Sequence, residues 1–556
     1  MGGGLIQLVA YGAQDMFLTG NPQITFFKSV YRRHTNFSIE SIKQSLTGTT
    51  DFKGKLEGTI SRNGDLIHRM YLQMKLPQID LTDGLSDDYY IAFRWLNWIG
   101  HVLIKNVSVT IGGQEIDKHT GEWLHLWNEL TQKSEKAEAY AEMVGNVPRL
   151  TQIHSAYKAT GVTRTPCVIE DYKLYVPLQF WFNRHIGLAL PIIALQYHDV
   201  TINIELEELE NCIWATLQNT SSNYATKTGA TVFADSNTTT TPTLDSVELY
   251  VDYIFLDTAE RKRFAQVAHE YLIERVQNKS TTTIQSNNNQ ATLSLKSLSH
   301  PVKEIVWVIQ ANSFINGEYT QSRAGRQYFN YTDSFDYSNF TGTPETYWGP
   351  GMKGGRSPQN LWYGLPTVKV EGLLNQSSAF ANSTTGVTDA TAGYNDVSDY
   401  TPSTGAVNTY ENRYMEDLVG PALAQPVVGN STGLWSATSN NLPILDNGKN
   451  PTATAKLVLN GNDRFSQRDG FYFNVVQPYE CHTGQCAPGI NVYSFSLKPE
   501  DYQPSGTCNF SRIDNADLEL TLSTNIQNFT SKARVYALSY NILRVMSGMG
   551  GLAYSS

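Results

Sequence analysis

Two stretches of the chain carry residue types that bind metal ions in other proteins. His269-Glu270-Tyr271-Leu272-Ile273 begins like a zinc-protease helix, but isoleucine stands where that motif needs its second histidine. Cys481 and Cys486 lie five residues apart, and His482 is the one obvious further ligand nearby. A structural zinc site takes four ligands. We therefore predict no metal site, and interpret Cys481 and Cys486 as free thiols or as a single loop disulfide.

Two glycine patterns have the spacing of a phosphate-binding loop and of a nucleophile elbow. Residues 349–354 fit the dinucleotide spacing, but no apolar strand leads into them and no helical pattern follows. Residues 429–433 fit Gly-x-Ser-x-Gly, yet a Ser/Asn-rich stretch follows where that motif needs a helix. Glycine and serine are abundant in this part of the chain, so both patterns are interpreted as chance. The sequence predicts no cofactor.

The remaining candidates for chemistry are pairs of histidines and of carboxylates. His119 and His125 flank a predicted strand-to-helix loop, and as ligands they would need a third partner. Asp87-Asp88 and Glu207-Glu208 could in principle do acid–base work. Adjacent acids on a strand point to opposite faces, and in loops they are usually solvated. We interpret all of these residues as structural, and predict no catalytic residue and no enzymatic activity.

Composition indicates a folded protein with more than one domain. The 556 residues exceed the size of a single hydrophobic core. Charged residues make up 17%, below the usual value of about 25%. Aromatic residues make up 11%, enough to supply cores and to argue against disorder. The formal net charge of -10 argues against direct nucleic-acid binding, which normally uses a basic face.

Apolar residues that alternate with polar ones predict a chain built mainly from strands. Residues 70–76 alternate in this way before Pro77, and residues 174–180, 200–206 and 247–253 repeat the period of two. One clear helix is predicted over residues 123–130, where Trp123, Leu126, Trp127 and Leu130 recur at helical spacing.

The chain contains an internal repeat. Residues 109–117 and 457–465 each form an alternating strand, a glycine turn and a polar exit, and each leads after the same gap to an aromatic residue, Trp123 or Phe471. Other matching blocks follow in the same order: residues 37–40 with 271–274, 178–203 with 495–520, and 253–256 with 540–543. Each match is weak alone, but the shared order indicates a tandem duplication.

The changing offset between the copies locates extra residues. The offset is 234 at the first pair (37 to 271) and 348 at the second (109 to 457), so the second copy gains over 100 residues between them. We predict an all-β protein of two tandem eight-stranded antiparallel jelly rolls with short helices and long loops. The predicted bounds are 1–30 for an N-terminal arm, 31–257 for the first jelly roll, 258–268 for a linker helix, 269–545 for the second with an insertion at about 310–454, and 546–556 for a tail.

Residues 1–6 carry no recognisable secretory or lipid signal. They lack the basic and long apolar regions of a signal peptide, and Ile6 stands where myristoylation needs Ser or Thr. Five cysteines, few and odd in number, fit a reducing compartment. We expect synthesis and retention in the cytosol.

Asn-x-Ser/Thr sequons are frequent in the predicted insertion, where its composition also generates them by chance. A cytosolic protein would not meet the secretory glycosylation machinery. The candidate glycosylation residues are Asn330, Asn339, Asn375, Asn382 and Asn430.

Several motifs together resemble the major capsid proteins of nucleocytoplasmic large DNA viruses, of the chlorovirus, algal-virus and giant-virus type. They span nearly the whole chain and lie at residues 8–15, 18–28, 31–33, 188–191, 196–198, 251–257, 504–515 and 546–554. The insertion at about 310–454 departs from the family, because it is longer than a compact member would carry.

This resemblance implies a structural protein with two jelly rolls per chain. It implies a homotrimer that forms pseudo-hexagonal capsomers, contacts neighbouring capsomers and tiles an icosahedral shell. It further implies an arm that meets minor capsid proteins and the inner membrane, and outer loops that face the host and carry glycans. The protein would be assembled in the host cytoplasm and located in the virion.

Three alternatives remain at this point. The insertion could act as a host-attachment or carbohydrate-binding surface, the chain could be a minor capsid protein, or it could be a jelly-roll enzyme. The missing metal motifs and nucleophile disfavour the enzyme. A solution mass discriminates a trimeric capsid subunit from a monomeric enzyme, and glycan binding that is lost on deletion of residues 340–440 would favour attachment.

Overall fold

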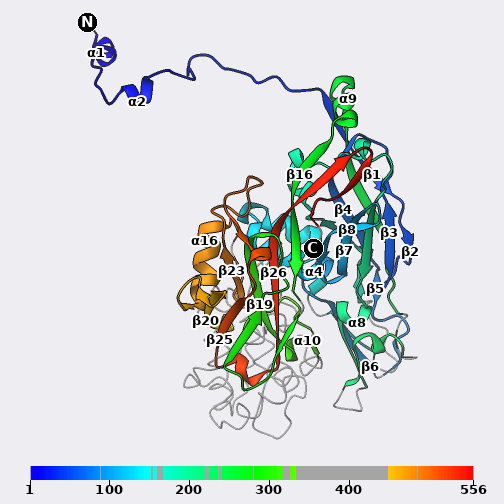
Figure 1. The fold of residues 1–556 in the computed structure, drawn as a ribbon. Coiled ribbons are helices and arrows are strands. Elements are labelled where there is room, and N and C mark those ends of the chain that lie inside the picture. The colour runs from blue at the N-terminus through cyan, green and yellow to red at the C-terminus, as the bar shows by residue number, and fades with distance from the viewer. Residues whose placement is uncertain are drawn as a thin grey trace.

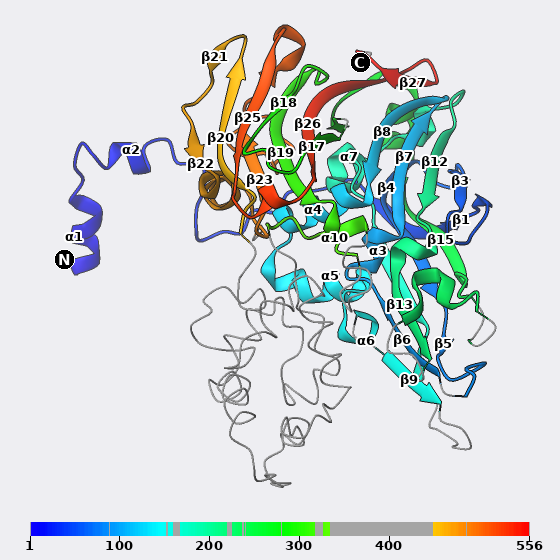
Figure 2. The same ribbon diagram turned by 90° about the horizontal axis from the view of Figure 1, so that it is seen from below.

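The computed structural model describes residues 2–87, 89–151, 154–158, 167–219, 225–235, 238, 241–279, 281–316, 326–333, 449–484 and 486–554. Two antiparallel β-sandwiches stand side by side, and an extended N-terminal arm runs away from both (Figures 1 and 2). Helices are short in the described residues, and none of them is both long and apolar enough to cross a membrane.

The first sandwich packs two main sheets around one core. The first sheet has the order β1 (Phe37–Gln44), β15 (Ser246–Leu256), β4 (Leu66–Leu76) and β11 (Tyr172–Pro177). The second sheet has the order β2 (Thr47–Gly48), β3 (Lys55–Thr59), β12 (Val200–Leu206), β7 (Ile104–Ile111) and β8 (Gln114–Thr120). Smaller sheets add β14 (Ala225–Thr228), β13 (Ile213–Asn219), β6 (Tyr89–Trp95) and β9 (His154–Lys158), and β10 (Val168–Ile169) with β5 (Ile79–Asp80).

The second sandwich repeats this plan. One sheet has the order β16 (His269–Asn278), β26 (Ser531–Met546), β19 (Pro301–Ala311) and β23 (Ile490–Ser494), with β17 (Thr282–Ile284), β24 (Cys508–Asn509) and β27 (Met549–Leu552) at its margins. The other has the order β18 (Gln290–Ser294), β25 (Ala516–Leu522), β20 (Thr452–Leu459) and β21 (Asn462–Asp463), with β22 (Arg468–Asp469) beside β20. Its core contains Trp307, Phe473 and Leu518.

Short helices connect the strands. They are α1 (Gly3–Val9), α2 (Met16–Thr19), α3 (Ile99–Val102), α4 (Gly121–Thr131), α5 (Ala137–Val144), α6 (Pro148–Thr151), α7 (Trp181–Arg184), α8 (Leu209–Cys212), α9 (Thr258–Gln266), α10 (Ser313–Asn316) and α16 (Gln477–Cys481), the last preceded by a π-helical turn, η6 (Tyr472–Val476). The helix predicted over residues 123–130 is therefore confirmed as α4. In the sequence, α9 connects the last strand of the first sandwich to the first strand of the second. Asp257 caps this helix by accepting hydrogen bonds from the backbone of Ala259 and Glu260.

The strand registers reproduce the sequence repeat. Residues 37–40 pair with residues 253–256, and residues 271–274 pair with residues 540–543, residue for residue in the same register. The blocks that match in sequence are thus hydrogen-bonded to each other in both sandwiches. Chance similarity between short strands would not produce this agreement, so the duplication is confirmed.

The two glycine turns occupy the same corner of each sandwich. Gly112 and Gly113 join β7 to β8 with φ of 57° and 82°, and Asn460 and Gly461 join β20 to β21 with φ of 49° and 80°. Two consecutive positive φ values define the tight type I′ hairpin, whose twist matches that of the flanking strands. Glycine or asparagine is needed there because other side chains are strained in this region.

One sequence match is wrong by a single residue. It made Val200 the counterpart of Asp517. In the structure Val200 pairs with Ile111, and Ala516 pairs with Leu459, the corresponding residue before the second turn. A one-residue slip moves every side chain of a strand to the opposite face, and it is Ala516 that is buried as Val200 is. That stretch lacks a glycine turn that would fix the alignment.

The predicted insertion lies largely outside the described residues. β19 continues to Ala311 and β20 begins at Thr452. Between them the structure describes residues 312–316, 326–333 and 449–451.

Alanine at the two turn glycines tests the repeat. An added Cβ meets nothing within 4 Å at Gly113 or Gly461, so only the positive φ opposes it. We expect Gly113→Ala and Gly461→Ala each to cost about 1 kcal/mol and to lower the thermal midpoint by a few degrees. Gly3→Ala, also free of contacts but without a positive φ, should leave the midpoint unchanged. Unequal effects of the two turn variants would argue against equivalent corners.

Candidate functional site: the junction between the two sandwiches

The residues singled out as metal ligands do not assemble into a site. Residues 269–273 lie on β16, where the zinc-protease motif would need a helix. Cys481 and Cys486 are both free thiols. Within the part of the chain that the structure describes, no group of three or more His, Cys, Asp or Glu side chains is arranged to hold a metal ion.

The two histidines near α4 are core residues. His125 stacks on Phe329 with 4.1 Å between ring centroids, and His119 stacks on Phe180 at 4.7 Å. Burial and the neighbouring His101 lower the pKa of His125 well below its ordinary value, so its ring is neutral at physiological pH.

The carboxylate pairs serve local contacts. Glu208 forms an exposed ion pair with Lys53 at 2.7 Å, and Glu207 accepts a hydrogen bond from the Asn211 side chain at 2.7 Å. Asp87 lies in a turn, and Asp88 lies outside the described residues.

Among the candidate glycosylation residues, only Asn330 can be placed. Its Nδ2 donates to Gln327 at 2.7 Å, its Oδ1 accepts from the Thr332 backbone at 3.0 Å, and the side chain is half-buried. A glycan on Nδ2 would compete with the first of these bonds. Asn339, Asn375, Asn382 and Asn430, and both glycine patterns at 349–354 and 429–433, lie outside the described residues.

The most elaborate set of side-chain contacts joins the two sandwiches through α4. Thr120 caps this helix by accepting a hydrogen bond from the Trp123 backbone at 3.2 Å. The helix follows β8 of the first sandwich, but its apolar face packs on the outer face of the β26–β19–β23 sheet of the second. The shared cluster contains Trp123, Leu126, Trp127 and Leu130 from α4 with Val306, Val308, Ile490, Val492, Tyr536 and Leu538 from that sheet.

A largely buried carboxylate, 16% exposed, anchors the first turn of α4. Glu122 Oε1 accepts from Arg534 Nη2 at 2.6 Å and from the Tyr331 hydroxyl at 3.0 Å, and Glu122 Oε2 accepts from the Tyr536 hydroxyl. The same Arg534 nitrogen also donates to Gln310 Oε1 at 2.6 Å. Glu122 thus connects the helix to β26 and to the loop that carries Tyr331, and Arg534 extends the contact to Gln310 of β19. Its charge at a helix N-terminus is also favoured by the helix dipole.

The C-terminal end of α4 is capped by a loop of the second sandwich. Gly484 donates its backbone N–H to the Leu130 carbonyl at 2.7 Å, and the Thr483 hydroxyl donates to the Thr131 carbonyl at 3.0 Å. The last carbonyls of a helix have no partner within it, so these bonds satisfy otherwise orphaned acceptors. A Cβ at Gly484 would lie 2.5 Å from the Leu130 oxygen, which explains why this position is glycine.

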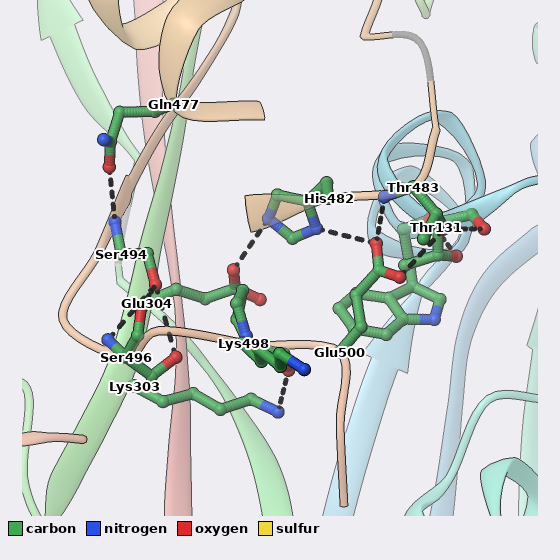
Figure 3. A network of polar contacts seen from close by, with 12 residues as sticks. Thr131, Lys303, Glu304, Gln477, His482, Thr483, Ser494, Ser496, Lys498 and Glu500 are labelled. Carbon is green, nitrogen blue, oxygen red and sulfur yellow. Dashed lines mark hydrogen bonds and ion pairs between the residues drawn. The ribbon is translucent and has the colours of Figure 1, made fainter. Parts of the chain in front are cut away.

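His482, beside that loop, is buried between two carboxylates (Figure 3). Its Nε2 lies 3.0 Å from Glu304 Oε2, and its Nδ1 lies 3.0 Å from Glu500 Oε1. Glu500 also accepts from the Thr483 backbone at 2.8 Å, and it shares the single proton of the Thr483 hydroxyl, 2.8 Å away, with the Thr131 carbonyl. Burial lowers the pKa of His482, but Glu304 and Glu500 outweigh burial and raise it to about 9. The imidazole is therefore a cation at neutral pH and orders the loop that caps α4.

A second charged contact crosses the junction at α7. Arg184 Nη1 lies 2.8 Å from Glu274 Oε2 on β16, and its guanidinium stacks over the Trp127 ring at 4.1 Å. Lys303 Nζ lies 2.5 Å from the other Glu274 oxygen. The arginine links the first sandwich to the second and covers the apolar face of α4 at once.

Sequence reasoning identified the apolar face of α4 but missed its partners. Glu122 is separated from Arg534 by 412 residues, and no local pattern connects them. The sequence does indicate that a partner is needed, because a helix with two tryptophans on one face requires a large apolar surface to cover them. It does not indicate which strands supply that surface.

Two antiparallel jelly rolls in series, joined by a packed helix, define the class of double jelly-roll viral capsid subunits. The structure of the Faustovirus major capsid protein superimposes with a TM-score of 0.60, covering 96% of this chain and 94% of that one at 13% identity, which shows the fold. Residues 25–257 match the family profile described as "Major capsid protein N-terminus", and residues 260–551 match "Large eukaryotic DNA virus major capsid protein". The chain belongs to the major capsid proteins of large eukaryotic DNA viruses.

Full-length relatives agree with this assignment. The chain is 43% identical over 586 residues to the major capsid protein of Phaeocystis pouchetii virus, and the match covers 100% of both chains. It is 29% identical to VP54 of PBCV-1, with a TM-score of 0.58 that covers 96% of this chain and 100% of that one. The predicted family, fold class and non-enzymatic role are thus confirmed. The protein is a structural component of a virus particle.

The anchor at Glu122 can be tested by Glu122→Gln. Removing one partner of a buried pair leaves the charge of Arg534 uncompensated, at a cost of roughly 3 kcal/mol. We expect a lower urea midpoint, with an early change in tryptophan fluorescence because Trp123 and Trp127 lie in the junction. Glu208→Gln, which breaks an exposed pair, serves as the control and should change little. Equal midpoints for both variants would show that Glu122 does not hold the junction.

The pKa of His482 predicts a dependence of stability on pH. It is raised from an ordinary 6.5 to about 9, so its contribution is complete below about pH 6.5 and is lost as the pH rises through 9. We expect the thermal midpoint of the wild type to fall more steeply between pH 7 and 10 than that of His482→Gln. Parallel profiles for the two proteins would contradict a charged His482.

Proposed function

We propose that three copies of this chain form a pseudo-hexagonal capsomer that tiles the icosahedral shell of a large DNA virus. The supporting observation is the junction at α4. It is a head-to-tail contact, because a helix of one jelly roll packs on the sheet of the next. Contacts of this kind close into a ring when the rotation between units divides a full turn.

The repeat supplies the parts of a larger ring. Each chain carries two similar jelly rolls, and six such units arranged around an axis correspond to three chains. A block with six similar lateral sides can tile a hexagonal lattice. Contacts between neighbouring capsomers can each be weak, since a shell repeats them many times.

The N-terminal arm is proposed to contact minor capsid proteins or an inner membrane beneath the shell. In Figures 1 and 2 it extends away from both sandwiches, α1 and α2 bury no residue, and the hydrogen bonds described for the arm join residues close in sequence. It exposes a run of large apolar side chains that a partner would cover: Leu5, Ile6, Leu8, Val9, Tyr11, Met16, Phe17, Leu18, Ile24, Phe26, Phe27, Val30 and Tyr31.

The remaining features stay predictions of this proposal. The long insertion of the second jelly roll would face the host and carry any glycans, and synthesis and assembly would take place in the host cytoplasm. The domain bounds predicted above would appear as protease-resistant fragments that begin near residues 31 and 269.

The oligomeric state is the first test. Native mass spectrometry of the purified chain should give about 186 kDa, three times the 62.1 kDa of one chain. A monomer or a dimer at micromolar concentration would contradict the proposal.

Deletion of residues 2–30 tests the arm. Because α1 and α2 bury no residue against the sandwiches, we expect the mass and the thermal midpoint to stay unchanged. Binding to inner components of the particle should be lost. Flotation with liposomes and capture of purified minor capsid proteins would tell a membrane partner from a protein partner. A truncated protein that still binds both would overturn this role.

A further inference from the structure

The second jelly roll exposes an apolar stripe on the helical segment that follows its hairpin. Phe471, Val475 and Tyr479 are spaced by four residues along η6 and α16, and their exposed fractions are 63%, 42% and 86%. Four residues make slightly more than one turn of an α-helix, so side chains spaced by four residues gradually move around the helix axis. A π turn contains more residues than an α turn and therefore compensates for this rotation. The three side chains therefore form one row on the surface.

This stripe is the counterpart of the docked face of α4. The offset of 348 residues that relates the two hairpins (109 to 457) also relates Trp123 to Phe471 and Trp127 to Val475. Trp123 and Trp127 pack against a neighbouring jelly roll within the chain. Their counterparts occupy the same position in the repeat, and among the described residues no second jelly roll packs on them.

The first jelly roll offers the matching sheet. β1, β15, β4 and β11 correspond to β16, β26, β19 and β23, because both sheets have the same strand order and their matched blocks share one register. The outer face of the second sheet is covered by α4. In the first sheet, the corresponding outer face is partly exposed along β4, β15 and β11, and no described helix packs across its centre.

A row of side chains with apolar area crosses each of the two outer faces. In the covered sheet one row is Tyr536, Val306 and Val492 on neighbouring strands, and Trp123 stacks on Tyr536 with 5.4 Å between ring centroids. In the open sheet one row is Tyr250, Tyr71 and Pro177 on the corresponding strands. Both rows present aromatic and aliphatic surface to a helix.

The charged side chains around the row of Tyr250, Tyr71 and Pro177 already form ion pairs with one another. Lys43 lies 2.5 Å from Glu248, the Tyr250 hydroxyl donates to Glu248 at 3.1 Å, and Lys75 lies 2.8 Å from Asp245. A docking helix would therefore not have to supply a counter-charge. The helical segment that carries the stripe also lacks the charge of α4, because Gly470 stands at the position that corresponds to Glu122 (122 to 470, the same offset of 348).

We propose that the stripe of Phe471, Val475 and Tyr479 docks on the Tyr71–Tyr250 row of a second copy of this chain. The proposal rests on the capsomer proposed above, and identifies the contact that joins its subunits. Figure 1 shows α16 at one side of the molecule, α4 in the middle and the first jelly roll at the other side. The two partner surfaces thus lie on different jelly rolls and meet only between chains, each chain repeating the α4 contact with the next.

Charged substitutions test the stripe. We expect Phe471→Glu and Val475→Glu to shift the mass in native mass spectrometry from a trimer to the 62.1 kDa monomer, with unchanged circular dichroism because both side chains are exposed in the single chain. Val267→Glu, at a residue that is 53% exposed beside α9, is the matched control and should remain trimeric. A wild-type trimer that both stripe variants leave intact would overturn the contact but not the capsomer. A wild-type monomer would overturn both.

Cross-linking tests the partner surface. Val475→Cys combined with Tyr250→Cys should give covalently linked trimers on mild oxidation, because each chain donates one thiol to the next around the ring. Neither single variant should cross-link above the wild type, whose own cysteines provide the background. Covalent dimers from Val475→Cys alone would show that the stripe pairs with itself, and would overturn the proposed docking.

Discussion

The arrangement of the molecule depends on the packing of α4 against the outer face of the β26–β19–β23 sheet. A sheet in a sandwich normally buries one face and leaves the other to water, which produces alternating burial along each strand. β4 of the first jelly roll shows this alternation, whereas β19 is buried at nearly every position from Val302 to Ala311. Val306 and Val308 make the centre of the outer face of β19 apolar, so the second jelly roll requires a cover there, and the first jelly roll supplies it.

An apolar face alone would let a helix settle in several positions along the groove. The charged groups at the two ends of α4 remove that freedom. Glu122 is satisfied only when it meets Arg534 and the two tyrosine hydroxyls, and the last carbonyls are satisfied only when Thr483 and Gly484 reach them. A shift by one turn would separate the Glu122 carboxylate from the Arg534 guanidinium and leave the last carbonyls of α4 without their donors, which costs more than the lost apolar contact. The apolar face thus provides attraction, and the buried charges fix the position.

The fold was predictable because its signals are local. Period-two alternation, a two-residue turn with positive φ and a helix cap each lie within a few residues, so the duplicated corners at Gly113 and Gly461 could be found from the sequence. The junction was not predictable, because Glu122 of the first sandwich and Arg534 of the second meet only after both sandwiches have formed, and His482 meets Glu304 and Glu500 only in the folded second sandwich. The misplaced counterpart of Val200 has the same origin: β12 and β25 carry no glycine that marks their register, and only pairing with β7 and β20 fixes it.

The same contact is used under two different constraints. Within a chain the junction forms once, during folding, and its surfaces never have to be soluble; valines and a buried ion pair are therefore tolerated on them. In the proposed contact between chains, both surfaces must face water before assembly. Tyrosines satisfy this condition because they combine apolar area with a hydroxyl that water can solvate, and the surrounding charges are already paired on their own face. Gly470 at the position that corresponds to Glu122 is what duplication followed by this change of constraint would produce.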